Sequence, residues 1–208
     1  MSKLKIWGRI SSINVKKAVW TAQELGLDFE RIEAGGVHGV VKTPEYVALN
    51  PNSQIPVLQD EDYVLWESNV ITRYLCAKHS LGNFCPTDLQ ERFDAERWME
   101  WQQTTVNPAS RNGFWHLVRL PADQRDPALI AQSNAAVELL MGILDDHLAT
   151  RSFMVGERFT MADIPLGCEV HRWFGLPQPR EPRPHIERWF ASLLARPAAK
   201  GVLDLALG

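Results

Sequence analysis

The sequence predicts an α/β domain followed by an all-α domain. Strand and helix patterns alternate through the first 78 residues, whereas only helical patterns occur from about residue 86 onward. The 208 residues exceed a typical single domain but fall short of two large ones. We therefore expect one body with two parts, residues 1–78 and 87–208, joined by a linker at 79–86.

The first predicted unit is β-α-β. "LKIWG" (4–8) alternates as a short strand, and "NVKKAVWTAQELG" (14–26) places Val15, Val19 and Ala22 on one helical face before Gly26 ends the helix. "FERIEA" (29–34) is the second strand. A single helix between two strands indicates parallel pairing with a right-handed crossover.

The second predicted unit is β-β-α. "IPVLQ" (55–59) and "YVLWE" (63–67) flank the acidic "DED" at 60–62, which indicates a hairpin. "SNVITRYLCAKH" (68–79) then has apolar residues at helical spacing, with Ser68 placed as the N-cap.

The rest of the chain predicts helices. Thr87 and Gln90 suit a capping box, and the helix they open extends to about Leu117 and is bent or interrupted at Pro108. A long helix begins at Pro127. Later helices begin near Pro184 and Pro197, after a proline-rich loop at 176–184.

"FTMADI" (159–164) has the pattern of a helix N-terminus. Thr160 is placed as the N-cap and Asp163 at the third helical position, while Phe159 and Ile164 are spaced to form a hydrophobic staple. The pattern therefore predicts a structural role for Asp163.

Composition excludes several classes of protein. The net charge is −3 with no polybasic stretch, which argues against nucleic-acid binding. The N-terminus lacks a long apolar region and no apolar run approaches about 18 residues, so we expect a cytoplasmic protein without a membrane segment. Three cysteines without a C-x-x-C pair indicate reduced, packed thiols, and six scattered histidines predict no metal site.

Four short motifs in the first 78 residues carry the chemistry: "SSIN" (11–14), "KTPE" (42–45), "NPNSQIPVL" (50–58) and "WES" (66–68). A cis Ile55–Pro56 bond entering a strand would present the backbone of Ile55 to a ligand. Backbone donors beside Glu67 and Ser68 would favour a carboxylate, and the Glu67 side chain an ammonium group. Together the motifs suit a small zwitterionic peptide at the sheet edge. Taken singly, each also fits a plain N-cap, a helix-dipole partner or a trans proline.

The order of these motifs resembles the glutathione S-transferase family over essentially the whole chain. The resemblance rests on "NPNSQIPVLQDEDYVLWESNVITRYL" (50–75), "FTMADI" and "HIERWFASLLARPA" (185–198). It implies a thioredoxin-like first domain, a helical-bundle second domain, glutathione as co-substrate without a metal, and a homodimer. No tyrosine or cysteine lies in the first strand or the turn after it. The chain therefore looks most like the serine-type bacterial, theta- or phi-like members.

The resemblance also implies a role for each motif residue. Ser12 would donate a hydrogen bond to the glutathione sulfur, with Ser11 as the alternative and Asn14 as a second polar contact. The peptide backbone would pair with Ile55 beside Pro56, and the γ-glutamyl end would be held by Glu67 and Ser68. Lys42 and Gln54 would meet the glycyl end. Val41 stands where relatives often have histidine, so the glycyl end is the least defined part.

The mechanism that this implies is activation of the glutathione thiol. A free thiol has a pKa near 8.5, and a hydroxyl donor at a helix N-terminus would lower the pKa by stabilising the thiolate. Serine is then a hydrogen-bond donor and not the nucleophile, since the sequence around it offers no His/Asp partner. The sulfur would attack an electrophilic small molecule.

The electrophile pocket is expected between the two parts of the chain, with Arg9, Arg111, Phe114 and Trp115 as candidates for an anionic or aromatic substrate. The alternative is that Phe114 and Trp115 belong to the core and Arg111 is a surface charge. Two other functions fit the same motifs: a non-catalytic binding or regulatory protein, and a glutathione-dependent isomerase, dehalogenase or peroxidase.

Overall fold

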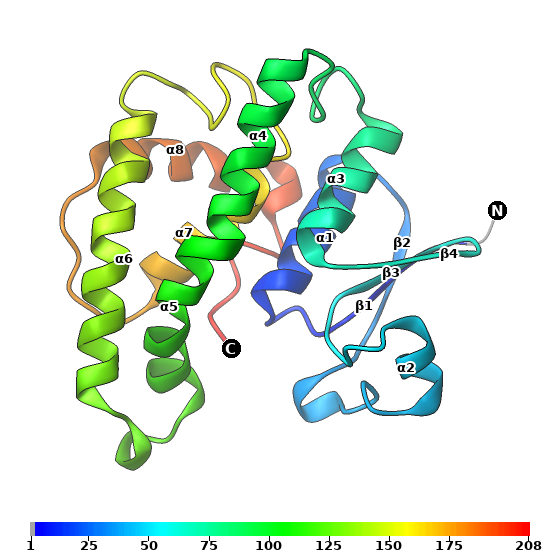
Figure 1. Cartoon of the computed structure of the whole chain (residues 1–208), viewed down its shortest axis with the longest axis horizontal. Helices are drawn as coiled ribbons and strands as arrows, with labels where there is room; N and C mark the ends of the chain where they lie inside the picture. Colours follow the sequence, from blue (N-terminus) through cyan, green and yellow to red (C-terminus); the bar gives the residue numbers. More distant parts are fainter. Residues whose placement is uncertain (1–2) are drawn as a thin grey trace.

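The structure is a computed structural model that describes residues 3–208. The first part of the chain contains β1 (Leu4–Trp7), α1 (Ile13–Glu24), β2 (Phe29–Ile32), α2 (Pro44–Leu49), β3 (Val57–Asp60), β4 (Tyr63–Trp66) and α3 (Ser68–His79). The second part contains α4 (Leu89–Trp101), α5 (Asn107–Phe114), α6 (Pro127–Leu148), α7 (Asp163–Gly175) and α8 (Pro184–Leu194). The mixed sheet and the helical bundle form two halves joined along α1 and α3 (Figure 1). The predicted α/β-then-all-α fold class is confirmed.

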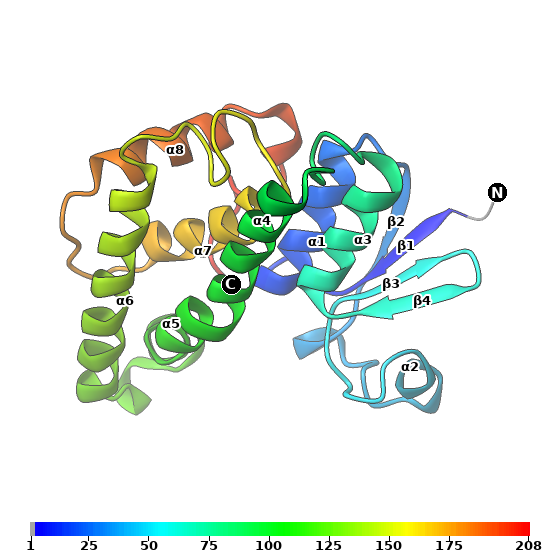
Figure 2. The same ribbon diagram turned by 45° about the horizontal axis from the view of Figure 1, so that its top comes forward.

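The four strands have the order β2-β1-β3-β4. β1 pairs with β2 in parallel and with β3 antiparallel, and β3 and β4 form the predicted hairpin. Both the β-α-β and the β-β-α predictions are therefore confirmed. The sheet has α1 and α3 on one face and α2 on the other (Figure 2).

Alternation along the strands divides the apolar residues between two cores. Leu4 and Ile6 of β1 face the larger core, which continues into the helical half. Val57 of β3 joins Ala34 and Tyr46 in a smaller core on the α2 side. Side chains of successive strand residues point to opposite faces, so one short strand contributes to both cores.

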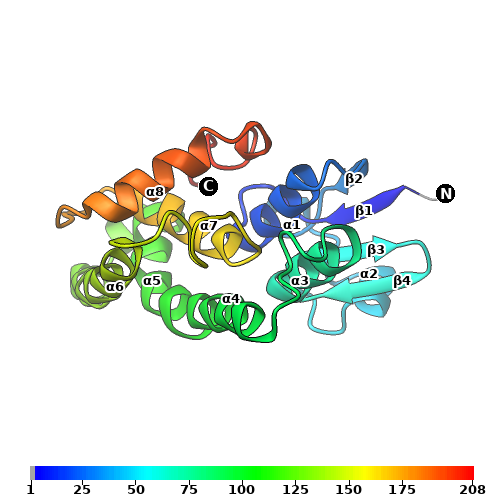
Figure 3. The same cartoon turned by 90° about the horizontal axis from the view of Figure 1, so that it is seen from above.

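α1 is buried on nearly all sides, because the sheet, α3 and α7 surround it (Figure 3). Val15, Val19 and Ala22 are in the core as their spacing predicts. Lys16 and Lys17 are also buried, at 3% and 0% exposure, which the amphipathic pattern did not indicate. Charged side chains are rarely fully buried unless they have a partner.

The structure contains a short helix that the sequence analysis left as an irregular segment. α2 begins at Pro44 after Thr43, whose side-chain oxygen accepts from the Tyr46 N–H at 3.3 Å. Proline in the first helical turn and threonine as the N-cap are the usual signals for a helix start.

Two predicted helix starts are shifted by one residue. Glu67, with φ 73°, is the N-cap of α3, so the N-cap prediction for Ser68 is wrong and Ser68 is the first helical residue. Asp88 caps α4 and accepts from the Glu91 N–H at 2.9 Å, which replaces the predicted capping box of Thr87 and Gln90. The N-cap of α6 is Asp126, with Pro127 in the first turn as predicted.

The helix predicted to be bent or interrupted at Pro108 changes from α- to π-helical geometry just before that residue, without a break in the chain of helical turns. Leu89 to Arg119 is continuous, because π-helical segments at Gln102–Val106 and Trp115–Arg119 connect α4, α5 and the following loop. Pro108 lies in the first turn of α5, directly after the first π-helical segment. Widened turns inside helices frequently occur at functional sites.

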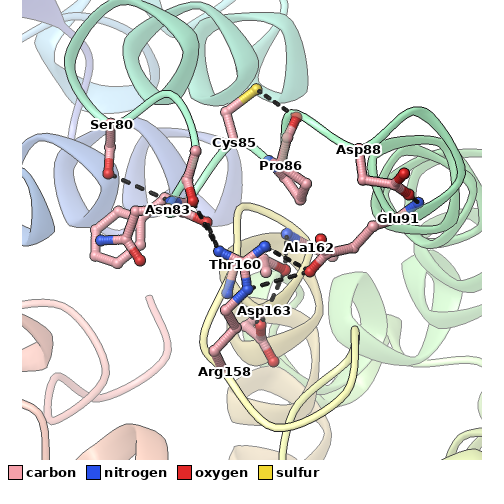
Figure 4. A network of polar contacts seen from close by, with 12 residues as sticks. Ser80, Asn83, Cys85, Pro86, Asp88, Glu91, Arg158, Thr160, Ala162 and Asp163 are labelled. Atoms are coloured by element: carbon pink, nitrogen blue, oxygen red, sulfur yellow. Dashed lines mark hydrogen bonds and ion pairs between the residues drawn. The ribbon is translucent and has the colours of Figure 1, made fainter.

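The segment between the two halves is tied to the start of α7 (Figure 4). Arg158 donates to the carbonyls of Gly82 and Asn83, both at 3.0 Å, and pairs with Glu91 at 2.6 Å. Asp163 accepts from the Thr160 N–H at 2.8 Å, so the predicted contact between the two residues is present. The N-cap prediction for Thr160 is wrong, because Ala162 is the N-cap of α7 and Asp163 is its first helical residue. The links fix how the linker passes from α3 to α4.

α6 reaches the length and apolar composition of a membrane-spanning helix, with a mean hydropathy of 1.3 over its most apolar window. Gln132, Ser133, Asn134 and Glu138 interrupt its apolar residues, so α6 is not an unbroken apolar run. α6 packs against α5 and α8 within the helical half. Its Glu138 accepts from the Trp173 indole N–H at 2.8 Å.

Candidate functional site

The N-termini of α1 and α3 meet at one place. The Ser68 hydroxyl donates to Oδ1 of Asn14 at 3.3 Å, which joins the first turns of the two helices. Each helix N-terminus carries unpaired N–H donors and a partial positive charge. Two such ends side by side favour an anion more strongly than one.

Ser12 is the N-cap of α1, with φ −84° and ψ 126°, but its side chain makes no capping hydrogen bond. The Ser12 carbonyl instead accepts the first helical bond from Lys16 at 2.9 Å. The hydroxyl of Ser12 is thus not used in the way a plain N-cap uses it. Ser11, its neighbour, lines a small hollow between the two halves of the molecule.

The Ile55–Pro56 peptide bond is cis, as predicted. The carbonyl of Gln54 accepts from the Tyr46 hydroxyl at 2.8 Å and from the Asn50 amide at 2.9 Å, which fixes the chain just before that bond. Burial raises the pKa of Tyr46 to about 12, so its hydroxyl stays a donor. Among residues 3–208 the backbone N–H and C=O of Ile55 have no hydrogen-bond partner.

Glu67 combines exposure with an unusual backbone. Its φ of 73° and ψ of 109° lie in a region that side chains with a Cβ rarely occupy. Such conformations cost about 1–3 kcal/mol and are concentrated at functional sites. The side chain is exposed at the start of α3, next to buried Ser68.

The other proposed ligands are exposed loop residues. Lys42 lies before α2, and Gln54 lies before the cis bond. Their side chains make no contact that fixes them in the described part of the chain. Gly8 and Gly35 pack against Ile55, since a Cβ on either glycine would lie 3.3 Å or less from the Ile55 side chain. The backbone of the site is therefore closely packed around Ile55.

The electrophile-pocket candidates occupy different environments. Phe114 lines the hollow with Ser11, and Arg9 is half-buried next to Gly36. Arg111 is exposed, and Trp115 is 52% exposed. Phe114 and Arg9 thus lie near the serine turn, whereas Arg111 and Trp115 face solvent.

Sequence reasoning missed four basic residues at the junction of the two halves. Arg172 and Arg119 both lie over the Phe114 ring, with guanidinium carbons 4.7 and 5.4 Å from its centroid. Lys16 and His171 line the same hollow as Phe114. The pairing of an arginine with nearby aromatics in "SRNGFWHLVRL" was noticed in the sequence, but it pointed to Arg111 and not to Arg119.

A buried polar network also crosses the junction. Lys17 of α1 donates to Gln102 at 2.8 Å, and Gln102 donates to Glu169 of α7 at 2.8 Å. Glu169 accepts from Ser110 at 2.6 Å and pairs with Arg172 at 3.2 Å. Burial lowers the pKa of Lys17 to about 8, although Glu169 partly offsets this effect. The network fixes α1 against the helical half.

The three cysteines are buried, and Cys168 lines the hollow with Ser11 and Phe114. Cys76, Cys85 and Cys168 are free and buried, which confirms their predicted packing. Burial raises the pKa of the Cys168 thiol to about 12. Within residues 3–208 no group of three His, Cys, Asp or Glu side chains is placed to hold a metal ion.

Comparison with known proteins gives a consistent result. The family model described as "Glutathione S-transferase, N-terminal domain" matches residues 2–77, and the C-terminal domain model matches residues 104–197. Glutathione S-transferase GstB of Escherichia coli K12 is 36% identical over 202 residues, which cover 96% of this chain and 97% of the relative.

Solved structures agree. The theta class glutathione S-transferase of Xanthomonas axonopodis pv. citri, solved with glutathione bound, has a TM-score of 0.96 and 42% identity, and each chain is fully covered. Elongation factor 1-gamma 3 of Oryza sativa is 29% identical over 193 residues, but the chain spans only 46% of its length. The thioredoxin-like sheet with its cis proline, the helical second half and these matches lead to one conclusion: the chain belongs to the glutathione S-transferase family of enzymes.

Proposed function

We propose that this enzyme activates the thiol of glutathione through the Ser12 hydroxyl, for attack on an electrophilic small molecule. The observation that carries the proposal is the junction of α1 and α3, where Asn14 and Ser68 are hydrogen-bonded and the Ser12 hydroxyl has no capping role. A sulfur at this junction would face one hydroxyl donor and two helix N-termini.

The free energy needed to lower the pKa of the glutathione thiol is small enough for a few hydrogen bonds and helix ends to provide. A free thiol has a pKa of about 8.5, and lowering it by roughly two units takes about 2.7 kcal/mol of preferential thiolate stabilisation. A hydrogen bond to an ionised acceptor contributes about 1.5–3 kcal/mol, and a helix N-terminus about 0.3–1 kcal/mol. One serine donor together with the two helix ends is therefore sufficient.

The peptide part of glutathione is assigned along the edge of the first domain. Glu67 and Ser68 hold the γ-glutamyl end, where a carboxylate meets the α3 N-terminus. The unpaired backbone groups of Ile55, beside Pro56, pair with the cysteinyl unit. Lys42 precedes α2, and Gln54 directly precedes the cis Ile55–Pro56 bond. We assign both side chains to the glycyl end of glutathione. The glutathione bound in the Xanthomonas relative supports the same class of ligand.

A test separates binding from activation. Glutathione affinity is measured by calorimetry, and the thiolate by its ultraviolet absorbance as pH is varied, in wild type, Ser12→Ala and Glu67→Ala. Ser12→Ala should raise the pKa of bound glutathione by about one to two units with affinity nearly unchanged. Glu67→Ala should weaken binding with little effect on the thiol. An unchanged thiol pKa in Ser12→Ala would refute the assignment.

The proposal includes a homodimer and the division into residues 1–78, 79–86 and 87–208. Five exposed apolar side chains lie on β4, α3 and α4, which follow one another along the chain. They are Tyr63, Trp66, Val70, Leu89 and Phe93. Exposed apolar side chains are common at interaction sites. Sedimentation equilibrium of wild type and of Phe93→Asp measures the dimer, which the charge should dissociate.

A non-catalytic binding function remains the second candidate, because translation elongation factor 1-gamma shares the fold with this chain. A catalytic function requires a lowered pKa of the bound glutathione thiol and turnover of an electrophile. Glutathione binding with an unshifted thiol pKa would favour the binding protein.

A further inference from the structure

Lys16 is a buried cation without a partner. Its exposure is 3%, and its Nζ makes no hydrogen bond to any residue that the structure describes. An unpaired buried charge destabilises a fold, so such a group is normally paired or used for binding. By contrast its neighbour Lys17 donates to two glutamine side chains. The difference singles out Lys16.

The nearby carboxylates are engaged elsewhere. Glu169 accepts from Gln102 and Ser110 and pairs with Arg172. Asp204 attracts the Lys16 ammonium through space, but it is exposed and accepts from the Gly201 N–H at 2.7 Å. No carboxylate among residues 3–208 therefore neutralises Lys16 by direct contact.

Lys16 lines a hollow beside the serine turn. The hollow has a volume of about 10 Å³, and the rest of its wall is formed by Ser11, Ile13, Phe114, Cys168, His171, Arg172 and Leu207. This is room for one water-sized group, such as a carboxylate oxygen. Phe114 offers a ring face at the same place, next to Arg172 and Arg119. The hollow has a hydroxyl, an ammonium and an aromatic wall.

The charge around the hollow is positive. Arg9 has a buried Nη1 without a partner in the described chain, and Arg9 and Arg172 both help to lower the pKa of Arg119, after burial. His171 is neutral at pH 7, since burial, followed by the charge of Lys16, lowers its pKa to about 4. Lys16 and Arg172 line the opening, and Arg9 and Arg119 add positive charge near it. Arg172 pairs with Glu169, and Arg119 donates to a main-chain oxygen of Gly208.

We propose that the second substrate is an anionic electrophile whose carboxylate is bound by Lys16 and Ser11, with Arg9 and Arg119 attracting it to the cleft. The inference rests on the proposed function and assigns different tasks to the two serines: Ser12 faces the glutathione sulfur and Ser11 faces the second substrate. When the electrophile is a halogenated arene carboxylate, the thiolate forms a carbon–sulfur bond at the carbon that carries the halogen, and the carbon–halogen bond breaks. The halide leaves with the bonding electron pair, and no oxidant is needed.

The experiment uses a matched pair of substrates, 4-chloro-3-nitrobenzoate and 4-chloro-3-nitrobenzamide, which differ in charge but hardly in shape. kcat/KM is measured for each and divided by the uncatalysed rate with glutathione. Wild type should favour the benzoate about tenfold, and Lys16→Met should remove about tenfold of that preference. The variant should fold with an unchanged or higher Tm, because it removes an unpaired buried charge.

Lys200→Met serves as the control, because Lys200 is an exposed lysine away from the hollow. It should leave the preference unchanged. Direct binding of 3-nitrobenzoate and 3-nitrobenzamide, followed by calorimetry, gives a readout that needs no turnover. Equal binding of the two compounds in wild type, or an unchanged ratio in Lys16→Met, would overturn the proposal.

The same data distinguish this failure from failure of the proposed function. Turnover of the benzamide with a lowered glutathione pKa, but no preference for the benzoate, would refute the anion site alone. Absence of turnover for both compounds, with selective benzoate binding lost in Lys16→Met, would refute the transferase mechanism and support the anion site.

Discussion

The hydroxyl of Ser68 donates to the Asn14 side chain at 3.3 Å, and through this contact the first turn of α3 is tied to the first turn of α1. The two helices leave the sheet from different strands, β4 and β1. Their N-termini converge because both helices pack on the same face of the sheet (Figure 2). The convergence, more than any single residue, creates a place suited to a thiolate.

The two serines of the turn should respond differently to mutation. Ser12→Ala removes a donor that acts on the thiolate, so kcat should fall about 10²-fold with little change in the KM for glutathione. Ser11→Ala should mainly raise the KM for an anionic electrophile. Steady-state kinetics of both variants with both substrates varied provide the measurement. Equal losses of kcat in the two variants would contradict the assignment.

Replacing Glu67 with glycine should increase stability but weaken glutathione binding. Glycine adopts φ 73° without steric cost, so Glu67→Gly should raise the free energy of unfolding by about 1 kcal/mol. The same change removes the carboxylate and should weaken glutathione binding. Glu67→Ala should weaken binding similarly without the gain in stability. Urea denaturation and calorimetry measure the two effects, and equal stability of the two variants would argue against backbone strain.

The strands and most helices could be predicted because their signals are local. Alternation in "YVLWE" and the helical spacing of Val15, Val19 and Ala22 depend only on the two repeat lengths of regular structure. The cis Ile55–Pro56 bond was not predicted by a local signal, because an X-Pro pair before a strand also fits a trans bond, and it was expected from the family resemblance. α2 was missed although Thr43 and Pro44 carry a start signal, since six residues are too few to show a periodic pattern.

The parts of the site that were not predicted depend on packing between distant segments. Lys16 and Lys17 look like a solvated pair in the sequence, but α7 covers them, and nothing within α1 indicates this. The N-cap of α3 is Glu67 and not the predicted Ser68, and Glu67 has a positive φ at the turn after β4. Arg119 enters the site only because the π-helical segments carry the chain beyond Phe114.

Asp163 should be essential for the fold but not for the chemistry. Its carboxylate accepts from the Met154 N–H, the Thr160 N–H and the Trp189 indole at 2.8–2.9 Å. Asp163→Ala leaves buried donors unpaired and should cost about 3–5 kcal/mol in the free energy of unfolding. Asp123→Ala, at an exposed position, is the control and should change stability by less than about 0.5 kcal/mol. A small loss in the Asp163 variant would refute this role.

His171 should make stability depend on pH between about 4 and 6.5. Burial, and then the Lys16 charge, lower the pKa of His171 to about 4 in the folded state, whereas the unfolded value is 6.5. The unfolded chain therefore binds the proton first, and up to about 3 kcal/mol of stability present above pH 6.5 is lost as pH falls to 4.

Asp163 contributes with the opposite sign, because burial raises its pKa to about 6 and the folded state takes up that proton first. The pH dependence of stability must therefore be compared between wild type and His171→Gln. His171 contacts the Leu205 carbonyl at 2.9 Å, and the glutamine amide can donate to the same carbonyl. Urea denaturation at intervals from pH 4 to 7 should show the histidine-dependent fall in wild type only. NMR titration of His171 in Lys16→Met should give a higher pKa than in wild type, since a nearby positive charge is removed. Coincident stability profiles for wild type and His171→Gln would contradict a neutral, buried His171.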